Sequence, residues 1–332
     1  MAESQQYRLI FMGAPDFAVR VLQHVARWPL GQVVAVYTSP DRPAGRGYKL
    51  KPPPVKVFAQ HCGFPVLQPT SLNTIETQQE FANLCPDFLL VASYGLLLPD
   101  AVLRIPRFPP LNVHPSLLPR YRGAAPVQRA VLESWHDGAT TGVSVMRIES
   151  RLDAGPVYAA SSRVIGDSTS GELLDVLADK GARLLLRVME QLLDGTARAD
   201  AQDERLACYA AKILKEDARV DWSRPAAEAH ARIRAMTPLP GAWSVFDFGE
   251  EQSSKLRFVL WPGKPTSLPS DVPPGAVLRD KHSLMVACGD HWYELSQVKP
   301  QGGAVMPIRD MLNGRLRHLP QGLCGRVVQS QT

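Results

Sequence analysis

The chain has 332 residues, of which 45% are hydrophobic and 21% are charged, and its formal net charge is +5. These proportions are close to those of an average soluble globular protein, and they exclude a fibrous or wholly disordered chain. We expect a cytoplasmic protein of two domains, because the length exceeds that of one ordinary core and neither a signal peptide nor a membrane-spanning apolar run is visible.

The first part of the chain alternates strand-like apolar runs with helical patterns. The sequence predicts a strand over 8–13 and then a helix over 16–27, with Asp16 as its cap. This alternation predicts an α/β domain over residues 1–193, with a doubly wound, mostly parallel, Rossmann-like sheet. Further strands are predicted over 33–37, 88–92, 111–114 and 142–146, and a long closing helix over 171–193.

The second part has a different character. The polar stretch 194–207 predicts a linker. After it, one helix is predicted over 225–236, followed by short strand-like runs between Pro and Gly clusters, which favours a small OB-like β-barrel over 208–332. Residues 211–332 hold 16 Lys and Arg against 12 Asp and Glu. The basic excess is therefore concentrated in the smaller domain, which suits an anionic partner.

Several ligand classes are disfavoured because their motifs are missing. The first predicted strand ends in Gly13-Ala-Pro-Asp16, which lacks the Gly-x-Gly-x-x-Gly spacing of a dinucleotide site, and no phosphate-binding P-loop motif occurs. The five cysteines are scattered without a Cys-x-x-Cys pair. We therefore expect reduced thiols and no bound metal.

The strongest chemical signal is the run Asn112-Val-His114-Pro-Ser116-Leu-Leu-Pro119, followed downstream by Asp153-Ala-Gly155. Side chains in a strand repeat with period two, so Asn112 and His114 project to the same side. Two donors on one side suit the stabilisation of a developing oxyanion. A single strand histidine is usually structural and an Asp-Ala-Gly is commonly a turn, so the combination carries the catalytic interpretation.

These motifs resemble the folate-dependent formyltransferase family, and the likeness runs nearly end to end. Its members that act on methionyl initiator tRNA are the most similar, through residues 41–47, 123–128 and 211–222. The resemblance implies transfer of the formyl group of 10-formyltetrahydrofolate, a co-substrate, to the α-amino group of methionine on that tRNA, in translation initiation. It also implies that Asn112 and His114 polarise the formyl carbonyl, while Asp153 holds the histidine and routes the amine proton through water.

The same resemblance implies where folate and tRNA bind. The loop of Ser116, Leu117, Leu118 and Pro119 would contact folate, and the stretch 94–98 is a weaker candidate for a pocket wall, with ordinary core as the alternative.

The segment 41–56 carries five basic residues against one acid and matches a loop beside the tRNA acceptor stem. Within it Arg46 is preferred for its flanking glycines, with Arg42 in reserve and Lys49 beside them, while Lys212 and the second domain would hold the tRNA body. We expect a monomer without membrane contact.

Three alternatives stay open at this point. The first is a folate-dependent formyltransferase acting on a small amine or a nucleotide-sugar substrate, which would share Asn112, His114 and Asp153 without needing the basic loop. The second is a hydrolase that gives the formyl group to water. The third is a non-catalytic RNA-binding protein on a borrowed fold, because fold alone does not dictate function.

Overall fold

The computed structural model describes residues 6–44, 49–135, 138–249 and 255–328. The chain forms two compact units. Unit 1 comprises residues 1–126, 141–163 and 174–210, and unit 2 comprises residues 127–140, 164–173 and 211–332. None of the helices formed by the described residues combines the length and the apolar character needed to span a bilayer.

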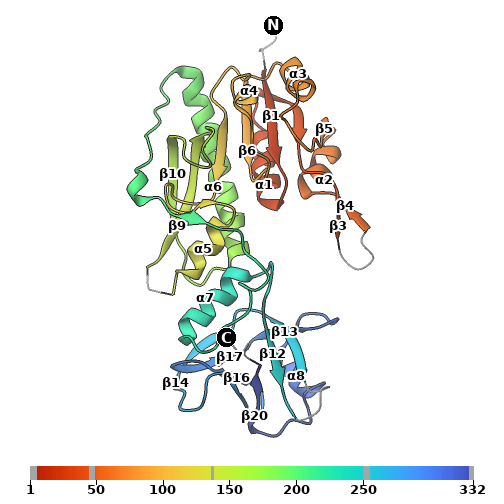
Figure 1. Cartoon of the computed structure of the whole chain (residues 1–332), viewed down its shortest axis with the longest axis vertical. Helices are drawn as coiled ribbons and strands as arrows, with labels where there is room; N and C mark the ends of the chain where they lie inside the picture. The colour runs from red at the N-terminus through yellow and green to blue at the C-terminus, as the bar shows by residue number, and fades with distance from the viewer. Residues whose placement is uncertain (1–5, 45–48, 136–137, 250–254, 329–332) are drawn as a thin grey trace. The chain divides into compact units, whose positions relative to one another are not determined.

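Unit 1 is built on a seven-stranded sheet in the order β10-β9-β7-β6-β1-β2-β5 (Figure 1). The pairs β1–β2, β1–β6, β2–β5 and β6–β7 are parallel, whereas β7–β9 is antiparallel. The mostly parallel α/β sheet predicted from the sequence is therefore confirmed. The strands are β1 (Tyr7–Gly13), β2 (Gly31–Tyr37), β5 (Val66–Leu67), β6 (Phe88–Ala92), β7 (Leu111–His114), β9 (Thr140–Arg147) and β10 (Val157–Val164).

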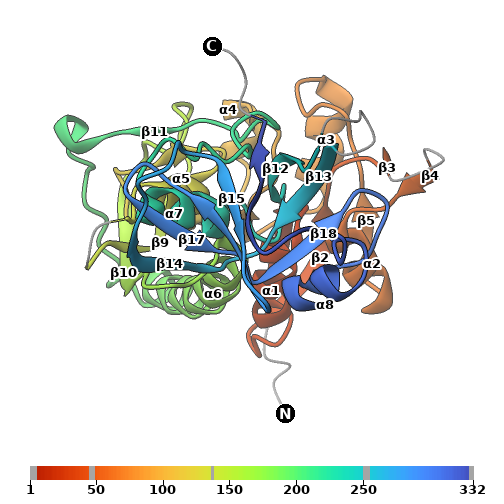
Figure 2. The ribbon, with the colours of Figure 1, turned by 90° about the horizontal axis from the view of Figure 1, so that it is seen from below.

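Helices cover both faces of this sheet, with α1 and α6 on one side and α3 and α4 on the other (Figure 2). Arg20 of α1 binds Asp175 of α6, with 2.8 Å between Nε and Oδ1. Gly181 of α6 lies so close to the sheet that a Cβ there would meet Val113 at 2.5 Å. The helices are α1 (Asp16–Val25), α2 (Pro54–His61), α3 (Ile75–Asn83), α4 (Asp100–Leu103) and α6 (Ser170–Asp194), the first residues of which belong to unit 2.

The start of α1 differs from its prediction. Pro15 is the residue before the helix, it makes no side-chain cap, and Asp16 is the first helical residue. The predicted capping role of Asp16 is therefore wrong. In the first turn its negative charge still favours the helix, because the unpaired N–H groups there carry partial positive charge.

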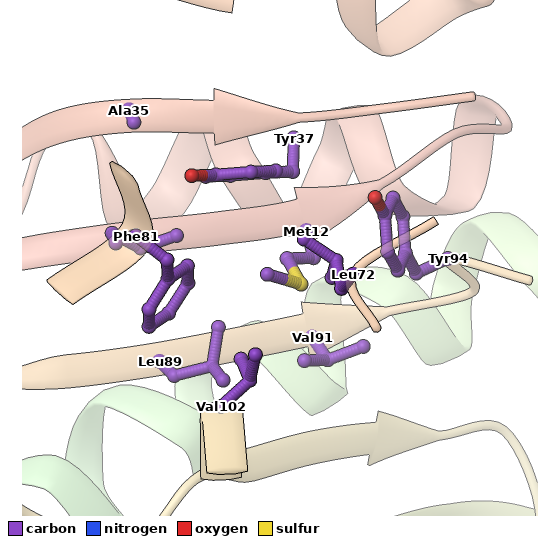
Figure 3. Packing of buried hydrophobic residues seen from close by; sticks show 10 residues of the cluster. Met12, Ala35, Tyr37, Leu72, Phe81, Leu89, Val91, Tyr94 and Val102 are labelled. Carbon is purple, nitrogen blue, oxygen red and sulfur yellow. The ribbon is translucent and has the colours of Figure 1, made fainter. Parts of the chain in front are cut away.

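The core on the α3–α4 side follows from strand alternation. Met12 of β1 and Leu89 and Val91 of β6 point to this face, where they pack with Phe81 of α3 and Val102 of α4 (Figure 3). Phe81, Leu89 and Val102 are fully buried. This packing fixes the edge of the sheet where β6 and β7 end and where ligands of such sheets bind.

Unit 2 contains a nine-stranded sheet in the order β14-β17-β16-β15-β20-β12-β13-β18-β19, and its strand pairs are antiparallel. The sequence predicts a small OB-like β-barrel for the second domain, and its β-rich character is confirmed as a domain built on an antiparallel sheet. The strands are β12 (Ala242–Asp247), β13 (Lys255–Leu260), β14 (Lys264–Pro269), β15 (Ala276–Arg279), β16 (Leu284–Ala287), β17 (His291–Glu294), β18 (Gln297–Pro300), β19 (Met306–Pro307) and β20 (Gly322–Val327). The helices are α5 (Pro126–Leu132), whose first residue belongs to unit 1, α7 (Ala226–Met236) and α8 (Ile308–Asn313).

Arg234 of α7 ties together the three stretches of chain that make up unit 2. Its Nη1 donates to the carbonyls of Gly166 and Ser168 at 2.7 and 3.2 Å, and its Nη2 lies 3.2 Å from the Ser134 hydroxyl. The residue is only 3% exposed, and burial lowers the pKa of its guanidinium. A buried charge needs such hydrogen bonds, so these carbonyls are part of what holds unit 2 together.

His230 of α7 is half-buried, with 13% of its side chain exposed. Its Nδ1 lies 3.0 Å from the hydroxyl of Tyr293, and that hydroxyl accepts the N–H of Gly263 at 2.7 Å. The phenol therefore has its own proton to donate to Nδ1, which must be unprotonated to accept it. Burial, assisted by Arg234, lowers the pKa of His230 to about 4.

We expect unit 2 to lose stability in mild acid because of His230. An unfolded histidine is protonated below about pH 6.5, whereas the pKa of folded His230 is about 4. The stabilisation is therefore fully present above pH 6.5 and is lost as the pH falls toward 4, about 2 kcal/mol of it between pH 7 and pH 5. Urea unfolding at the two pH values measures this loss, and the same loss in a His230→Gln variant would show that another group is responsible.

Candidate active site

Two of the predicted catalytic residues meet in unit 1. His114 ends β7, and Asp153 lies in the turn between β9 and β10. The distance from His114 Nδ1 to Asp153 Oδ2 is 3.7 Å, and the two side chains are 6% and 11% exposed. This distance suits an ion pair but exceeds a hydrogen bond. The sequence separates these residues by 39 positions, and the fold brings them together.

Each member of this pair is held by backbone from the loop after β7. His114 Nε2 lies 2.9 Å from the carbonyl oxygen of Tyr121, so Nε2 carries a proton and donates it. Asp153 Oδ2 accepts the N–H of Gly123 at 2.9 Å. Nδ1 of the imidazole consequently faces the carboxylate and is the nitrogen at which a proton can be gained or given up.

Asn112 lies in the middle of β7, next to Val91 of β6 and Met146 of β9 in register. It is two residues before His114, so both side chains point to the same face of the sheet. The Asn112 side chain is half-buried, and its carboxamide makes no hydrogen bond with another residue in the described part of the chain. The amide N–H groups are therefore available to a substrate oxygen.

The two loops that meet at this pair have unusual backbone conformations. Tyr121 has a φ of 59° and Asp153 a φ of 49°, in the left-handed region that side chains other than glycine rarely adopt. Such conformations cluster at functional sites, where the surrounding structure imposes them. Gly155 completes the second loop: a Cβ there would lie 2.0 Å from the carbonyl oxygen of Arg147. This contact gives the Asp-x-Gly spacing a steric reason.

The predicted folate loop follows His114 directly. Ser116 is fully buried, and its hydroxyl donates to the carbonyl of Arg120 at 2.7 Å, so this side chain shapes the loop from inside. Ser144 of β9 fastens the same loop, because its hydroxyl donates to the Ser116 carbonyl at 2.8 Å and accepts the Leu118 N–H at 3.2 Å. Leu117, Leu118 and Pro119 are all partly exposed. The loop therefore leaves part of its apolar surface accessible while the serine hydroxyl is buried, although the Leu117 side chain also packs over Gly142 of β9.

The stretch 94–98, the weaker candidate for a pocket wall, is mostly core. Tyr94 is 5% exposed and belongs to the core cluster of Figure 3, with Leu96 and Leu98 packed against it. Burial raises the pKa of Tyr94 to about 12. Leu97, in contrast, is 78% exposed. The alternative interpretation as ordinary core therefore describes three of the four named side chains.

The basic segment 41–56 contains a short antiparallel pair, β3 (Arg42–Ala44) and β4 (Lys49–Lys51). Arg46, the preferred tRNA contact, lies outside the described residues. Arg42 is exposed and sits directly opposite the exposed Lys51 in register. Like charges in opposed positions destabilise a strand pair unless a counter-charge is near. The described part of this segment thus exposes positive charge on both of its strands.

Lys56 plays a different part from the other basic residues of the segment. Its Nζ lies 2.8 Å from both carboxylate oxygens of Asp41, and Gln68 Nε2 donates to the same carboxylate at 2.8 Å. The Gln68 and Lys56 hydrogen bonds lower the pKa of the Asp41 carboxyl. Lys56 therefore fastens the base of the segment, and its charge is paired with Asp41.

Lys212 lies in unit 2, in the stretch before α7, and its side chain is exposed. Arg129 of α5 holds this stretch, since its Nε donates to the Ala211 carbonyl at 3.1 Å and its Nη2 lies 3.2 Å from Asp217 Oδ2. Leu214 N–H donates to the same carboxylate oxygen. The structure thus places Lys212 on a braced, outward-facing stretch.

Sequence reasoning missed a set of residues that surround the His114–Asp153 pair. The predicted linker 194–207 contains Gln202 and Glu204, both of which bind the guanidinium of Arg122. Arg122 lies three residues after the loop that ends at Pro119, and nothing in the local sequence indicated a partner 80 residues later. Gln202 lies in a polar, small-residue stretch that is typical of a linker, so no local pattern could have singled it out.

The cysteines are free thiols, as predicted. Cys62, Cys85 and Cys208 are exposed, and Cys288 is buried. Within the described ranges, no group of three or more His, Cys, Asp or Glu side chains could hold a metal ion.

Family models match both parts of the chain. The family model for the formyl transferase domain matches residues 7–189, and the model for the formyl transferase C-terminal domain matches residues 212–316. The chain therefore belongs to the formyl transferase family, and it is an enzyme of that class. The motifs around Asn112, His114 and Asp153 all lie within the first match.

A methionyl-tRNA formyltransferase from Desulfovibrio desulfuricans is 52% identical to this chain over 328 residues, which cover 98% of this chain and 97% of the relative. Among solved structures, HypX from Aquifex aeolicus in complex with tetrahydrofolic acid matches with a TM-score of 0.60 at 15% identity, over 98% of this chain and 51% of that one. An N-formyltransferase from Helicobacter canadensis, in complex with folinic acid and dTDP-3-aminofucose, matches with a TM-score of 0.57 at 16% identity, over 88% of this chain and all of that one. These structural likenesses concern the fold alone.

Proposed function

We propose that this protein transfers the formyl group of 10-formyltetrahydrofolate to the α-amino group of methionine on initiator tRNA. One observation carries the proposal: the 52% identity to a methionyl-tRNA formyltransferase extends over 98% of the chain, through both family domains. A formyltransferase of small amines or nucleotide sugars is not favoured, because the likeness to such enzymes is limited to the fold.

The proposed chemistry uses the three polar residues of unit 1. Formyl transfer requires an amine to attack the formyl carbon, negative charge to develop on the carbonyl oxygen, and the amine to lose a proton. The bond from that carbon to folate N10 then breaks, and N10 leaves with a proton. The Asn112 carboxamide donates a hydrogen bond to that oxygen, where a fixed donor stabilises the transition state. The sequence predicts that His114 polarises the same oxygen, but its Nε2 donates to the Tyr121 carbonyl and its Nδ1 faces Asp153. We therefore propose that His114 instead exchanges a proton at Nδ1, and that the Asp153 carboxylate 3.7 Å away stabilises the charged ring.

The residues after β7 fit a folate co-substrate, which supplies the formyl group. Flat heteroaromatic rings bind between apolar walls that carry a few backbone donors and acceptors. Leu117, Leu118 and Pro119 offer partly exposed apolar surface directly after His114. Ser116 supports this binding by organising the loop, with its hydroxyl on the Arg120 carbonyl.

The proposed division of labour assigns catalysis to residues 1–193 and tRNA binding to residues 208–332, with 194–207 between them. In the catalytic part, Arg42, Arg46 and Lys49 bind the acceptor stem through phosphates. In the other part, Lys212 contributes to holding the tRNA body. We also propose that the protein works in the cytoplasm, where initiator tRNA is charged, and as a monomer.

The assay for the activity supplies 10-formyltetrahydrofolate with methionyl initiator tRNA and follows formylmethionine. We expect formylation that requires the charged tRNA, with no formate released in its absence. A nucleotide-linked amino sugar serves as the competing acceptor. Formylation of that sugar without formylation of the tRNA would contradict the proposal, and formate release without any acceptor would indicate a hydrolase.

The Arg42→Ala variant tests the tRNA contact of the basic segment. Each cation that neutralises a phosphate releases counterions, so its loss should reduce the slope of log Kd against log salt by about 1 and weaken binding at low salt. Binding is measured by fluorescence anisotropy with labelled tRNA at four salt concentrations. Arg187→Ala, which removes an exposed cation from α6, is the control. Equal slopes for the two variants would remove Arg42 from the interface.

A further inference from the structure

The segment from Gln202 to Ala210 is hydrogen-bonded to both active-site loops of unit 1. Its end, β11 (Tyr209–Ala210), pairs in parallel with β8 (Arg122–Gly123). Just before this pair, the Cys208 sulfur accepts the Tyr121 N–H at 3.1 Å, and the Cys208 carbonyl accepts the Arg122 N–H at 2.9 Å. The segment therefore braces the backbone that binds both His114 and Asp153.

Gln202 reaches from this segment to the second loop. Its Nε2 donates to the carbonyls of Asp153 and Gly155 at 2.8 and 2.7 Å. Its Oε1 accepts two hydrogen bonds from Arg122, at 3.1 Å from Nε and 2.8 Å from Nη2. Both N–H donors and both lone pairs of the amide are thus used. A flipped amide would point its NH₂ group at the guanidinium, so the orientation is unique.

These contacts hold Asp153 at two points. Gly123 N–H binds its carboxylate at 2.9 Å, and Gln202 binds its carbonyl at 2.8 Å. The φ of 49° at Asp153 costs free energy, so the turn needs restraint from outside to keep it. The Gln202 amide supplies that restraint on both sides of Ala154.

We propose that Gln202 is a positioning residue for formyl transfer, which sets the Asp153 carboxylate against His114 by locking the Asp153–Gly155 turn onto Arg122. The inference rests on the proposed function, because Asp153 must matter for the reaction. The hydrogen bonds of Gln202 go to the carbonyls of Asp153 and Gly155 and to Arg122, so Gln202 acts through the position of Asp153. A displacement of about 1 Å at a reacting group can lower a rate roughly 100-fold.

Gln202→Glu is the sharpest variant. The carboxylate keeps its attraction for Arg122 but has no N–H to donate, and it faces the two carbonyl oxygens of Asp153 and Gly155. We expect kcat for formyl transfer to fall about 10- to 100-fold, while KM for tRNA and for folate stays within about twofold. Arg205→Ala, which removes an 88% exposed side chain of the same segment, is the control and should keep wild-type kcat.

A double-mutant cycle separates positioning from general loosening. In an Asp153→Asn background, Gln202→Glu should cause little further loss of kcat, because both changes affect the same element. Independent losses that multiply would overturn the proposal. A wild-type kcat for Gln202→Glu would also overturn it. If the wild-type enzyme formylates methionyl-tRNA, that result would leave the proposed function intact.

Amide hydrogen exchange at Gly123 gives a readout that does not depend on activity. Its N–H is protected by the Asp153 carboxylate, so Gln202→Glu should speed its exchange about tenfold, with no such change in Arg205→Ala. If the wild-type protein formylates no tRNA, the proposed function falls, and this measurement still decides the structural claim. Unchanged exchange at Gly123 in Gln202→Glu would overturn it.

Discussion

Replacement of Asn112 by alanine should slow formyl transfer roughly 100- to 1,000-fold, which is the usual loss when one donor to a developing oxyanion is removed. The carboxamide lies on the same face of β7 as His114 and makes no hydrogen bond within the described part of the chain, so no structural contact is lost. The fold should therefore survive the change. Binding of tRNA should also be unaffected, because the basic segment is untouched.

Single-turnover formylation of methionyl-tRNA measures the Asn112→Ala effect without interference from product release. Asn112→Asp is the matched variant, since it keeps the size of the side chain and removes the N–H donors. Both variants should fail alike, with unchanged thermal unfolding. A rate above one-tenth of wild type for the alanine variant would exclude Asn112 as an oxyanion donor.

Phe81→Ala should strongly destabilise unit 1, with a loss of about 3–5 kcal/mol in the free energy of unfolding. Phe81 is fully buried, and its ring centroid lies 5.7 Å from that of Tyr37 in the core shown in Figure 3. Alanine would leave a cavity between α3 and the sheet. Well-packed interiors relax only partly around such a cavity.

Urea denaturation followed by circular dichroism measures this loss. Phe81→Leu, which keeps most of the buried volume, should cost less than the alanine variant, on the order of 1 kcal/mol. The ratio of kcat to KM for the alanine variant should stay near wild type at low temperature, where the protein remains folded. A loss below 1 kcal/mol for alanine would mean that the cavity collapses.

The parts of the fold that were predictable are those with a local period. In β1 the side chains of Ile10 and Met12 alternate with those of Leu9 and Phe11, and all four are buried, as in a parallel strand covered on both faces. The recurrence of leucines over 171–193 predicted α6 to within one residue at each end. Such patterns depend only on residues that are close in sequence, so they can be read from the sequence alone.

The parts that escaped prediction depend on contacts between distant segments. Asn112 and His114 could be placed on one face by strand alternation, but the hydrogen bonds of Gln202 join residues that are 47 and 49 positions apart in the Asp153 turn and 80 positions apart at Arg122. The inward hydroxyl of Ser116 follows from the conformation of its loop, which no residue pattern specifies. Lys56 looked like its basic neighbours until Asp41 and Gln68 were seen beside it.

The hydrogen bond between Cys208 and Tyr121 has a practical consequence for labelling. Cys208 is exposed, so maleimide dyes will reach it together with Cys62 and Cys85. A dye on its sulfur takes away the acceptor of the Tyr121 N–H, and the carbonyl of the same tyrosine holds His114. Fluorophores for single-molecule work are therefore better attached at Cys62, with serine in place of Cys85 and Cys208, since a serine hydroxyl can still accept that N–H.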